Sequence, residues 1–129
     1  MFSHVMLGSN DVAAAGEFYA AVLAPLGLES VYQGEDHVAF AESEAAQPWF
    51  WVTKPYDGNA ASVGNGTHVA FLAPSREAVR RFYDVALALG GQDEGAPGLR
   101  PQYSETYYGT YVRDPDGNKI QAVCYAPDS

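Results

Sequence analysis

The sequence predicts an α+β fold built from two copies of a βαβββ module, and an internal repeat is the first reason. When the chain is shifted by 64 residues, eight of the 24 positions from His4 to Gly27 match their partners. Unrelated segments would give about one or two matches at ordinary residue frequencies. The matches are His4-Val5 with His68-Val69, Ala14 with Ala78, Phe18-Tyr19 with Phe82-Tyr83, Leu23-Ala24 with Leu87-Ala88, and Gly27 with Gly91.

The second observation is the hydrophobic pattern of the first copy, residues 1–58, which indicates a strand, a helix and three further strands in that order. A strand is expected at residues 2–7, followed by a helix that Asn10 or Asp11 caps and Gly27 closes. Three more strands are expected at residues 29–33, 37–42 and 49–53. A linker rich in Gly and Asn then leads into the second copy.

The second copy, residues 64–129, repeats this order less regularly. We expect a strand at residues 67–72, a helix capped by Ser75 and closed by Gly90-Gly91, and a weak strand near Gln92-Asp93. A loop over residues 95–106 separates these from strands at residues 107–113 and 119–125. Between the last two strands, Asp114-Pro115-Asp116-Gly117-Asn118 is a strong hairpin signal, which is our third observation. Residues 1–129 then form a single domain.

Composition excludes several classes of protein. With 47% apolar and 13% aromatic residues the chain should fold, and no apolar stretch is long enough to span a membrane. Seven basic against sixteen acidic side chains give a net charge of −9, which disfavours nucleic acid. One cysteine excludes an internal disulfide, and the N-terminus lacks the pattern of a signal peptide. We expect a cytoplasmic protein that contacts neither nucleic acid nor membrane.

Strand alternation places two histidines at equivalent positions. Val5, Leu7, Val69 and Phe71 form the apolar face under each helix, so His4 and His68 lie on the opposite face. Gln121, Val123 and Tyr125 share the corresponding face of the last strand. If the modules pack with pseudo-twofold symmetry, the two imidazoles face each other as ligands for a divalent metal. The alternative is that the pair repeats a duplicated packing residue.

Aromatic side chains suggest a ligand-binding surface. Trp49 and Trp51 share one face of the fourth strand, and either Tyr107 with Tyr111, or Tyr108, projects from the seventh. We select Trp49, Trp51, Tyr108 and Tyr111 as candidate substrate-binding residues for a cationic or planar ligand. Ordinary core or interface packing is the alternative.

These segments together resemble the vicinal oxygen chelate superfamily, which groups glyoxalase I, extradiol dioxygenases, fosfomycin-resistance enzymes, methylmalonyl-CoA epimerase and bleomycin-resistance proteins. The resemblance rests on His4-Val5, Phe18-Tyr19, Leu26-Gly27-Leu28, His68-Val69-Ala70-Phe71 and residues 114–120. It implies the glyoxalase/bleomycin-resistance/dioxygenase fold, in which two modules form cupped mixed sheets around a metal and an oxygen-bearing substrate, and it implies a homodimer.

Carried over by position, the resemblance implies metal ligands at His4, His68 and Gln121. At the position of Gln121 the family usually has Glu. The fourth strand also lacks the family's Glu, because no acid lies between Ala45 and Tyr56. A neutral amide binds a cation more weakly than a carboxylate does. No catalytic residue can be assigned from the sequence.

Two functions therefore remain. The favoured one is a small-molecule enzyme of lyase, isomerase or dioxygenase type that uses Fe, Mn, Ni, Co or Zn. The other is a metal-free protein that binds or sequesters a small molecule, similar to bleomycin-resistance proteins. The symmetric histidines favour the enzyme, and the missing carboxylates favour the binding protein. A wholly structural role is the remaining possibility.

Overall fold

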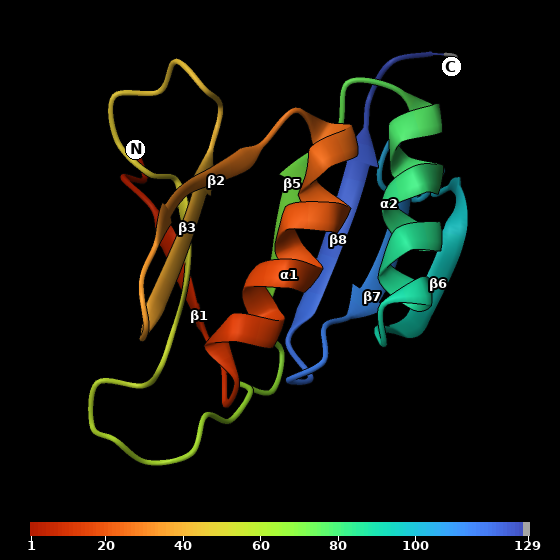
Figure 1. The fold of residues 1–129 in the computed structure, drawn as a ribbon. Helices are drawn as coiled ribbons and strands as arrows, with labels where there is room; N and C mark the ends of the chain where they lie inside the picture. Colours follow the sequence, from red (N-terminus) through yellow and green to blue (C-terminus); the bar gives the residue numbers. More distant parts are fainter. Residues whose placement is uncertain (128–129) are drawn as a thin grey trace.

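A computed structural model describes residues 1–127 and contains two four-stranded mixed sheets, each with a helix on one face (Figure 1). The first sheet has the order β1-β4-β3-β2, with β1 parallel to β4 and the other pairs antiparallel. Its strands are β1 (Val5–Gly8), β2 (Glu29–Gln33), β3 (His37–Ala41) and β4 (Phe50–Thr53). The predicted order of elements in the first module is confirmed.

The second sheet repeats this arrangement with the order β5-β8-β7-β6. Strand β5 is parallel to β8, and the β8-β7 and β7-β6 pairs are antiparallel. Its strands are β5 (His68–Leu72), β6 (Gln92–Leu99), β7 (Tyr108–Arg113) and β8 (Lys119–Cys124). The identical topology of the two sheets confirms that the chain is a tandem repeat of one βαβββ module.

The helices begin at the predicted caps. In α1 (Val12–Leu23) the cap is Asp11 rather than Asn10, since the Asp11 side chain accepts a hydrogen bond from the Ala14 N–H at 3.0 Å. The short 3-10 helix η1 (Ala24–Leu26) follows and ends at Gly27, whose φ of 84° lies in the left-handed region. The Ser75 hydroxyl caps α2 (Arg76–Ala88) by accepting from the Ala78 N–H at 3.1 Å.

Strand β6 differs from the prediction. We expected a loop from Gly95, but β6 continues to Leu99 because Gly95, Gly98 and Leu99 also pair with β7. Glycine and proline weaken a strand locally, and the register shifts between Asp93 and Gly95 and again between Gly95 and Gly98. The loop is therefore shorter than expected. The first strand is also shorter, since it begins at Val5 instead of Phe2.

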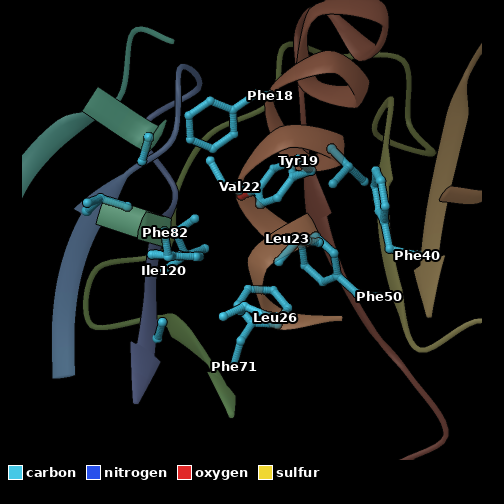
Figure 2. Packing of buried hydrophobic residues seen from close by; sticks show 14 of the residues in the cluster. Phe18, Tyr19, Val22, Leu23, Leu26, Phe40, Phe50, Phe71, Phe82 and Ile120 are labelled. Atoms are coloured by element: carbon cyan, nitrogen blue, oxygen red, sulfur yellow. The ribbon is translucent and has the colours of Figure 1, made fainter. Parts of the chain in front are cut away.

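Both modules contribute to one hydrophobic core (Figure 2). Helices α1 and α2 contact each other, and each covers the core-facing side of its own sheet. The rings of Phe50 from β4 and Phe71 from β5 meet edge to face at 5.0 Å between centroids, which joins the two sheets directly. The buried rings around this contact are Phe18, Tyr19, Phe40 and Phe82.

This shared core sets the direction of the uncovered sheet faces. The helix-covered faces of both sheets point into the same core, so each sheet keeps an open face of its own on the outside of the molecule. His4 precedes β1 on the side of the first sheet's open face, and His68 lies on the open face of the second sheet. Within one chain the two imidazoles do not form a common site. No helix among residues 1–127 is long and apolar enough to cross a membrane.

Candidate functional site

A hollow of about 460 Å³ lies on the open face of the second sheet. Strands β5, β7 and β8 supply its floor, and the loop between β6 and β7 forms part of its wall. The residues that line it are His68, Tyr103, Ser104, Tyr107, Tyr111, Gln121 and Tyr125. Four of these seven side chains are phenols and none is a carboxylate, so the hollow offers aromatic faces and neutral hydrogen-bonding groups.

Gln121 is the central polar group of the floor and is only 2% exposed. Its Oε1 lies 3.0 Å from His68 Nε2, and its Nε2 donates to the Tyr107 hydroxyl at 2.9 Å. Because an amide oxygen only accepts, the chemistry of the pair places a proton on His68 Nε2. The buried amide therefore fixes the orientation of an imidazole and a phenol at the same time.

The sheet register explains why these residues meet. Gln121 on β8 pairs with Tyr111 on β7, and on its other side with Ala70 on β5, two residues after His68. Gly109 keeps space free beside them, since a Cβ there would lie 3.2 Å from Tyr107 Cε1 and 3.5 Å from Gln121 Nε2. The missing side chain lets the Tyr107 ring lie over the sheet.

The tyrosines form a connected group around the hollow. The Tyr107 ring lies 5.1 Å from Tyr103 and 5.4 Å from Tyr125, and the Tyr111 ring meets His68 edge to face at 6.1 Å. Burial, together with hydrogen bonding to Tyr107, raises the pKa of Tyr111 to about 12. Its hydroxyl is thus a neutral donor over the physiological pH range.

The structure brings together only some of the residues selected from the sequence. His68, Gln121 and Tyr111 share the hollow. Trp51 belongs to the other sheet, where it contacts Tyr32 and His37, and Trp49 directly precedes the same strand. Trp49 and His68 both line a second hollow, of about 410 Å³, between residues of β1, β4 and β5. His4 is exposed, and its Nδ1 lies 2.9 Å from the Ser3 hydroxyl.

Tyr108 lies on the helix-covered side of the second sheet, opposite Cys124, with the guanidinium groups of Arg76 and Arg80 against its ring. Side chains alternate along β7, so Tyr108 and Tyr111 point to opposite faces. Tyr108 therefore does not line the hollow, and we leave it out of the candidate site.

Sequence reasoning did not select Tyr103, Tyr107 or Tyr125, although the structure places all three in the hollow. A signal for Tyr107 was present, because it has the same parity as Tyr111 along β7. Tyr125 has the same parity as Gln121 along β8. Nothing local predicted Tyr103, since its place depends on how the loop folds back, with the Tyr103 N–H donating to the Arg100 carbonyl at 2.9 Å.

The comparison with protein families agrees with the fold. Residues 1–122 match the model of the glyoxalase/bleomycin resistance protein/dioxygenase superfamily. The chain belongs to this superfamily. Among curated proteins, no match was found.

Solved structures of the superfamily have the same fold. A glyoxalase/bleomycin resistance protein from Albidiferax ferrireducens T118 is 38% identical, with a TM-score of 0.85 over 96% of this chain and 98% of that one. A lactoylglutathione lyase from Agrobacterium tumefaciens is 24% identical, with a TM-score of 0.66 over 96% and 92%. The fosfomycin resistance protein FosX from Listeria monocytogenes is 18% identical, with a TM-score of 0.68 over the same shares. The last two show likeness of fold only.

Members of this superfamily commonly use divalent metals, so we tested the donor set of this chain. Residues 1–127 contain no group of three or more His, Cys, Asp or Glu side chains that could hold an ion. At the hollow, the two atoms that could coordinate an ion, His68 Nε2 and Gln121 Oε1, are uncharged and hydrogen-bonded to each other. Among residues 1–127, the side chains of one chain therefore do not fit a resident metal. An ion would need further ligands from elsewhere, and His68 would have to move its proton from Nε2 to Nδ1.

Proposed function

We propose that this protein binds a small molecule in the hollow over the second sheet, without a resident metal. One observation carries the proposal: a buried amide, Gln121, holds His68 and Tyr107 in place at the base of a tyrosine-lined hollow. A hollow of this size, with aromatic walls and a few fixed polar groups, is typical of small-molecule sites. Binding or sequestration is the function that this geometry supports best.

The chemistry of the lining favours binding over proton abstraction. Abstraction next to a carbonyl needs a positioned base, and the family's carboxylate positions hold Gln121 and no acid here. The phenols can stack on a planar ligand, and the Tyr107 hydroxyl, which accepts from Gln121, can donate its own proton to an oxygen atom of that ligand. The polar groups thus orient a ligand while the rings supply most of the contact area.

Chemical-shift mapping of the side-chain amide of Gln121 and the ring of His68 tests this proposal. The probes are benzoate, benzyl alcohol and benzylammonium, which share one ring and differ in charge. We expect at least one probe to shift both residues, and His68→Ala to weaken that binding. His37→Ala is the matched control, because His37 bonds Thr53 on the other sheet. If none of the three probes shifts these residues, the proposal is wrong.

A second candidate is a metal-dependent lyase, isomerase or dioxygenase in which His4, His68 and Gln121 are ligands. It is favoured by the adjacency of His68 and Gln121, two of the three positions at which the resemblance implies ligands, and it requires their mutual hydrogen bond to break. Since His4 lies on the other sheet, a second copy of the chain would have to supply it, so this candidate requires a homodimer.

The charge distribution supports pairing of unlike modules between two copies. Six of the seven basic residues follow residue 64, and Lys54 alone precedes it. The sixteen acidic residues divide equally, eight on each side of that point. The first module thus has a net charge of −7 and the second of −2, so contact between unlike modules of two copies is less repulsive than contact between two first modules.

Elemental analysis of the purified, untagged protein tests the metal candidate. Near-stoichiometric Mn, Fe, Ni, Co or Zn that is lost in both His4→Ala and His68→Ala would support it. Absence of bound metal, together with no thermal stabilisation by any of the five added ions, would overturn it. Gln121→Glu sharpens the comparison, because a carboxylate at the same place should raise metal affinity if the ion binds there.

A further inference from the structure

We infer that the hollow over the second sheet selects planar aromatic ligands bearing an anionic oxygen group, such as an aromatic carboxylate. This inference rests on the proposed binding function and names the class of ligand. It depends on the local charge around Tyr111, which is opposite in sign to the net charge of −9 of the whole chain.

Two cationic groups already lie against the Tyr111 ring. The Arg100 guanidinium is 5.6 Å and the Lys119 ammonium 5.3 Å from the ring centroid. Tyr111 lines the hollow, so both cations lie against one of its lining side chains, although neither is itself a lining residue. A cationic ligand that approached this ring would meet repulsion from both groups, whereas an anionic ligand would be attracted.

Arg100 has donor capacity to spare. Its Nη1 and Nη2 each donate to a backbone carbonyl, of Gly98 and Ala96 respectively, at 2.9 Å. No salt bridge to Arg100 occurs among residues 1–127. A guanidinium has five N–H donors, so further N–H groups can bind an anion.

The backbone ties Arg100 to the loop that forms part of the wall of the hollow. Its N–H donates to the Tyr107 carbonyl at 2.8 Å, which closes the base of the loop that carries Tyr103. Gly98 leaves room for the side chain, since a Cβ there would lie 3.2 Å from Arg100 Nη1. The guanidinium is thus bound to the end of β6, next to the loop that carries Tyr103 and Tyr107.

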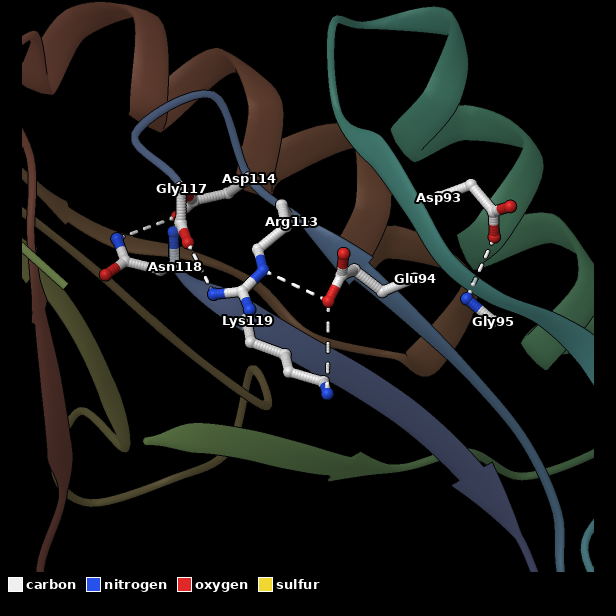
Figure 3. Close-up of polar contacts among 8 residues, drawn as sticks. All are labelled: Asp93, Glu94, Gly95, Arg113, Asp114, Gly117, Asn118 and Lys119. Carbon is white, nitrogen blue, oxygen red and sulfur yellow. Dashed lines mark hydrogen bonds and ion pairs between the residues drawn. The ribbon is translucent and has the colours of Figure 1, made fainter. Parts of the chain in front are cut away.

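Lys119 is only partly neutralised by its acidic neighbour (Figure 3). Glu94 Oε1 lies 3.3 Å from Arg113 Nε and 4.0 Å from Lys119 Nζ, so one carboxylate faces two cations. None of the seven lining residues is acidic. Three cations on this face of the sheet are thus balanced by a single carboxylate, which leaves a local excess of positive charge. The cations are Arg100, Arg113 and Lys119, and the carboxylate is Glu94.

The tyrosines account for the aromatic part of the ligand. Tyr103, Tyr107 and Tyr125 surround the hollow with their rings in contact, which suits a flat ring that stacks on one of them. The Tyr107 hydroxyl can donate to a second oxygen on the ligand. A carboxylate near Arg100 and a ring among the tyrosines would use both features at once.

Calorimetry with benzoate, benzyl alcohol and benzylammonium at low salt tests this selectivity. We expect benzoate to bind about tenfold or more tightly than benzyl alcohol, and benzylammonium to bind most weakly. Arg100→Gln should remove most of the advantage in affinity that benzoate has over benzyl alcohol. Arg81→Gln is the matched control, because it removes the same charge from an exposed position on α2.

The outcomes distinguish this inference from the function on which it rests. If benzyl alcohol or benzylammonium binds as tightly as benzoate at His68 and Gln121, the binding function stands and the selectivity is wrong. If Arg81→Gln weakens benzoate as much as Arg100→Gln does, the effect is one of net charge and the inference is again wrong. If no probe shifts His68 or Gln121, the proposed function itself fails.

Discussion

The Tyr19 hydroxyl donates a 2.5 Å hydrogen bond to the Asp114 carboxylate, which links α1 of the first module to the β7-β8 turn of the second. Asp114 is 3% exposed and also accepts from the backbone N–H groups of Asp116 and Asn118 and from the Asn118 side chain. Burial raises the pKa of Asp114, while hydrogen bonds from Tyr19 and Asn118 act in the opposite direction. The hairpin motif read from the sequence thus serves as a contact between modules.

Tyr19→Phe should destabilise the protein by about 1–3 kcal/mol at pH 7, because a buried carboxylate loses a donor. The folded Asp114 binds its proton more tightly than the unfolded one, so its contribution to stability is greatest below the unfolded pKa. That contribution falls as the pH rises to the folded pKa. Loss of the Tyr19 bond raises the folded pKa further, so the variant should lose less stability at pH 4 than at pH 7.

Urea unfolding at the two pH values checks this prediction, with Tyr56→Phe as the control because Tyr56 is fully exposed. An equal loss at pH 4 and pH 7 would contradict the assignment to Asp114.

Phe71→Ala should cost about 3–5 kcal/mol, since the ring is 8% exposed and contacts Phe50 in the other sheet. Because the two modules share one core, we expect a single unfolding transition in both the parent and the variant. Leu72→Ala is the control, since Leu72 is the next residue along β5 and its side chain is 69% exposed. Two resolved transitions in calorimetry would show that the modules unfold independently.

Gly109→Ala should weaken ligand binding more than it weakens the fold. The added Cβ would lie 3.2 Å from Tyr107 Cε1 and 3.3 Å from the Ala122 carbonyl, so the Tyr107 ring must move. We expect benzoate affinity to fall by about tenfold, with a change in unfolding free energy on the order of 1 kcal/mol. Benzoate affinity and unfolding free energy are measured on one preparation of the variant. Unchanged affinity would show that Tyr107 does not belong to the binding site.

A mixture of His4→Ala and His68→Ala chains tests the two-copy metal site. If one copy supplies His4 and its partner supplies His68, each mixed dimer contains one intact site and one site that lacks both histidines. Metal binding should then reappear after the two variants are unfolded and refolded together, although neither binds metal alone. A mixture that stays metal-free while the parent protein binds metal would exclude a site shared in this way.

Several features were predictable because they depend on short-range chemistry. Asp11 and Ser75 cap their helices, Gly27 closes the first, and the turn at residues 114–118 connects β7 to β8. Strand β6 was missed after Gly95 because its glycines and proline argue locally against a strand. Only the pairing with β7 across the sheet keeps that segment extended.

The candidate site was predictable only in part, for a related reason. Alternation within a strand relates Gln121 to Tyr125 and Tyr111 to Tyr107, and the same rule excludes Tyr108 once one member of the strand is placed. Apolar patterning assigned His68 and Gln121 to the open face, but β7 carries a tyrosine on each side, so alternation left open whether Tyr107 with Tyr111 or Tyr108 shares that face. The net charge of −9 likewise favoured a cationic ligand, whereas Arg100 and Lys119 make the surroundings of Tyr111 locally positive.

The amino-acid sequence by itself determined the duplicated βαβββ module, its order of elements and the superfamily, because periodicity, caps and turns act over a few residues. Only the tertiary structure decided that both helices pack into one shared core, which leaves each sheet with a separate open face. For that reason His4 and His68, which are equivalent in the repeat, do not form one site within a chain. Long-range packing, which no local pattern encodes, instead unites His68 with Gln121 and the tyrosines.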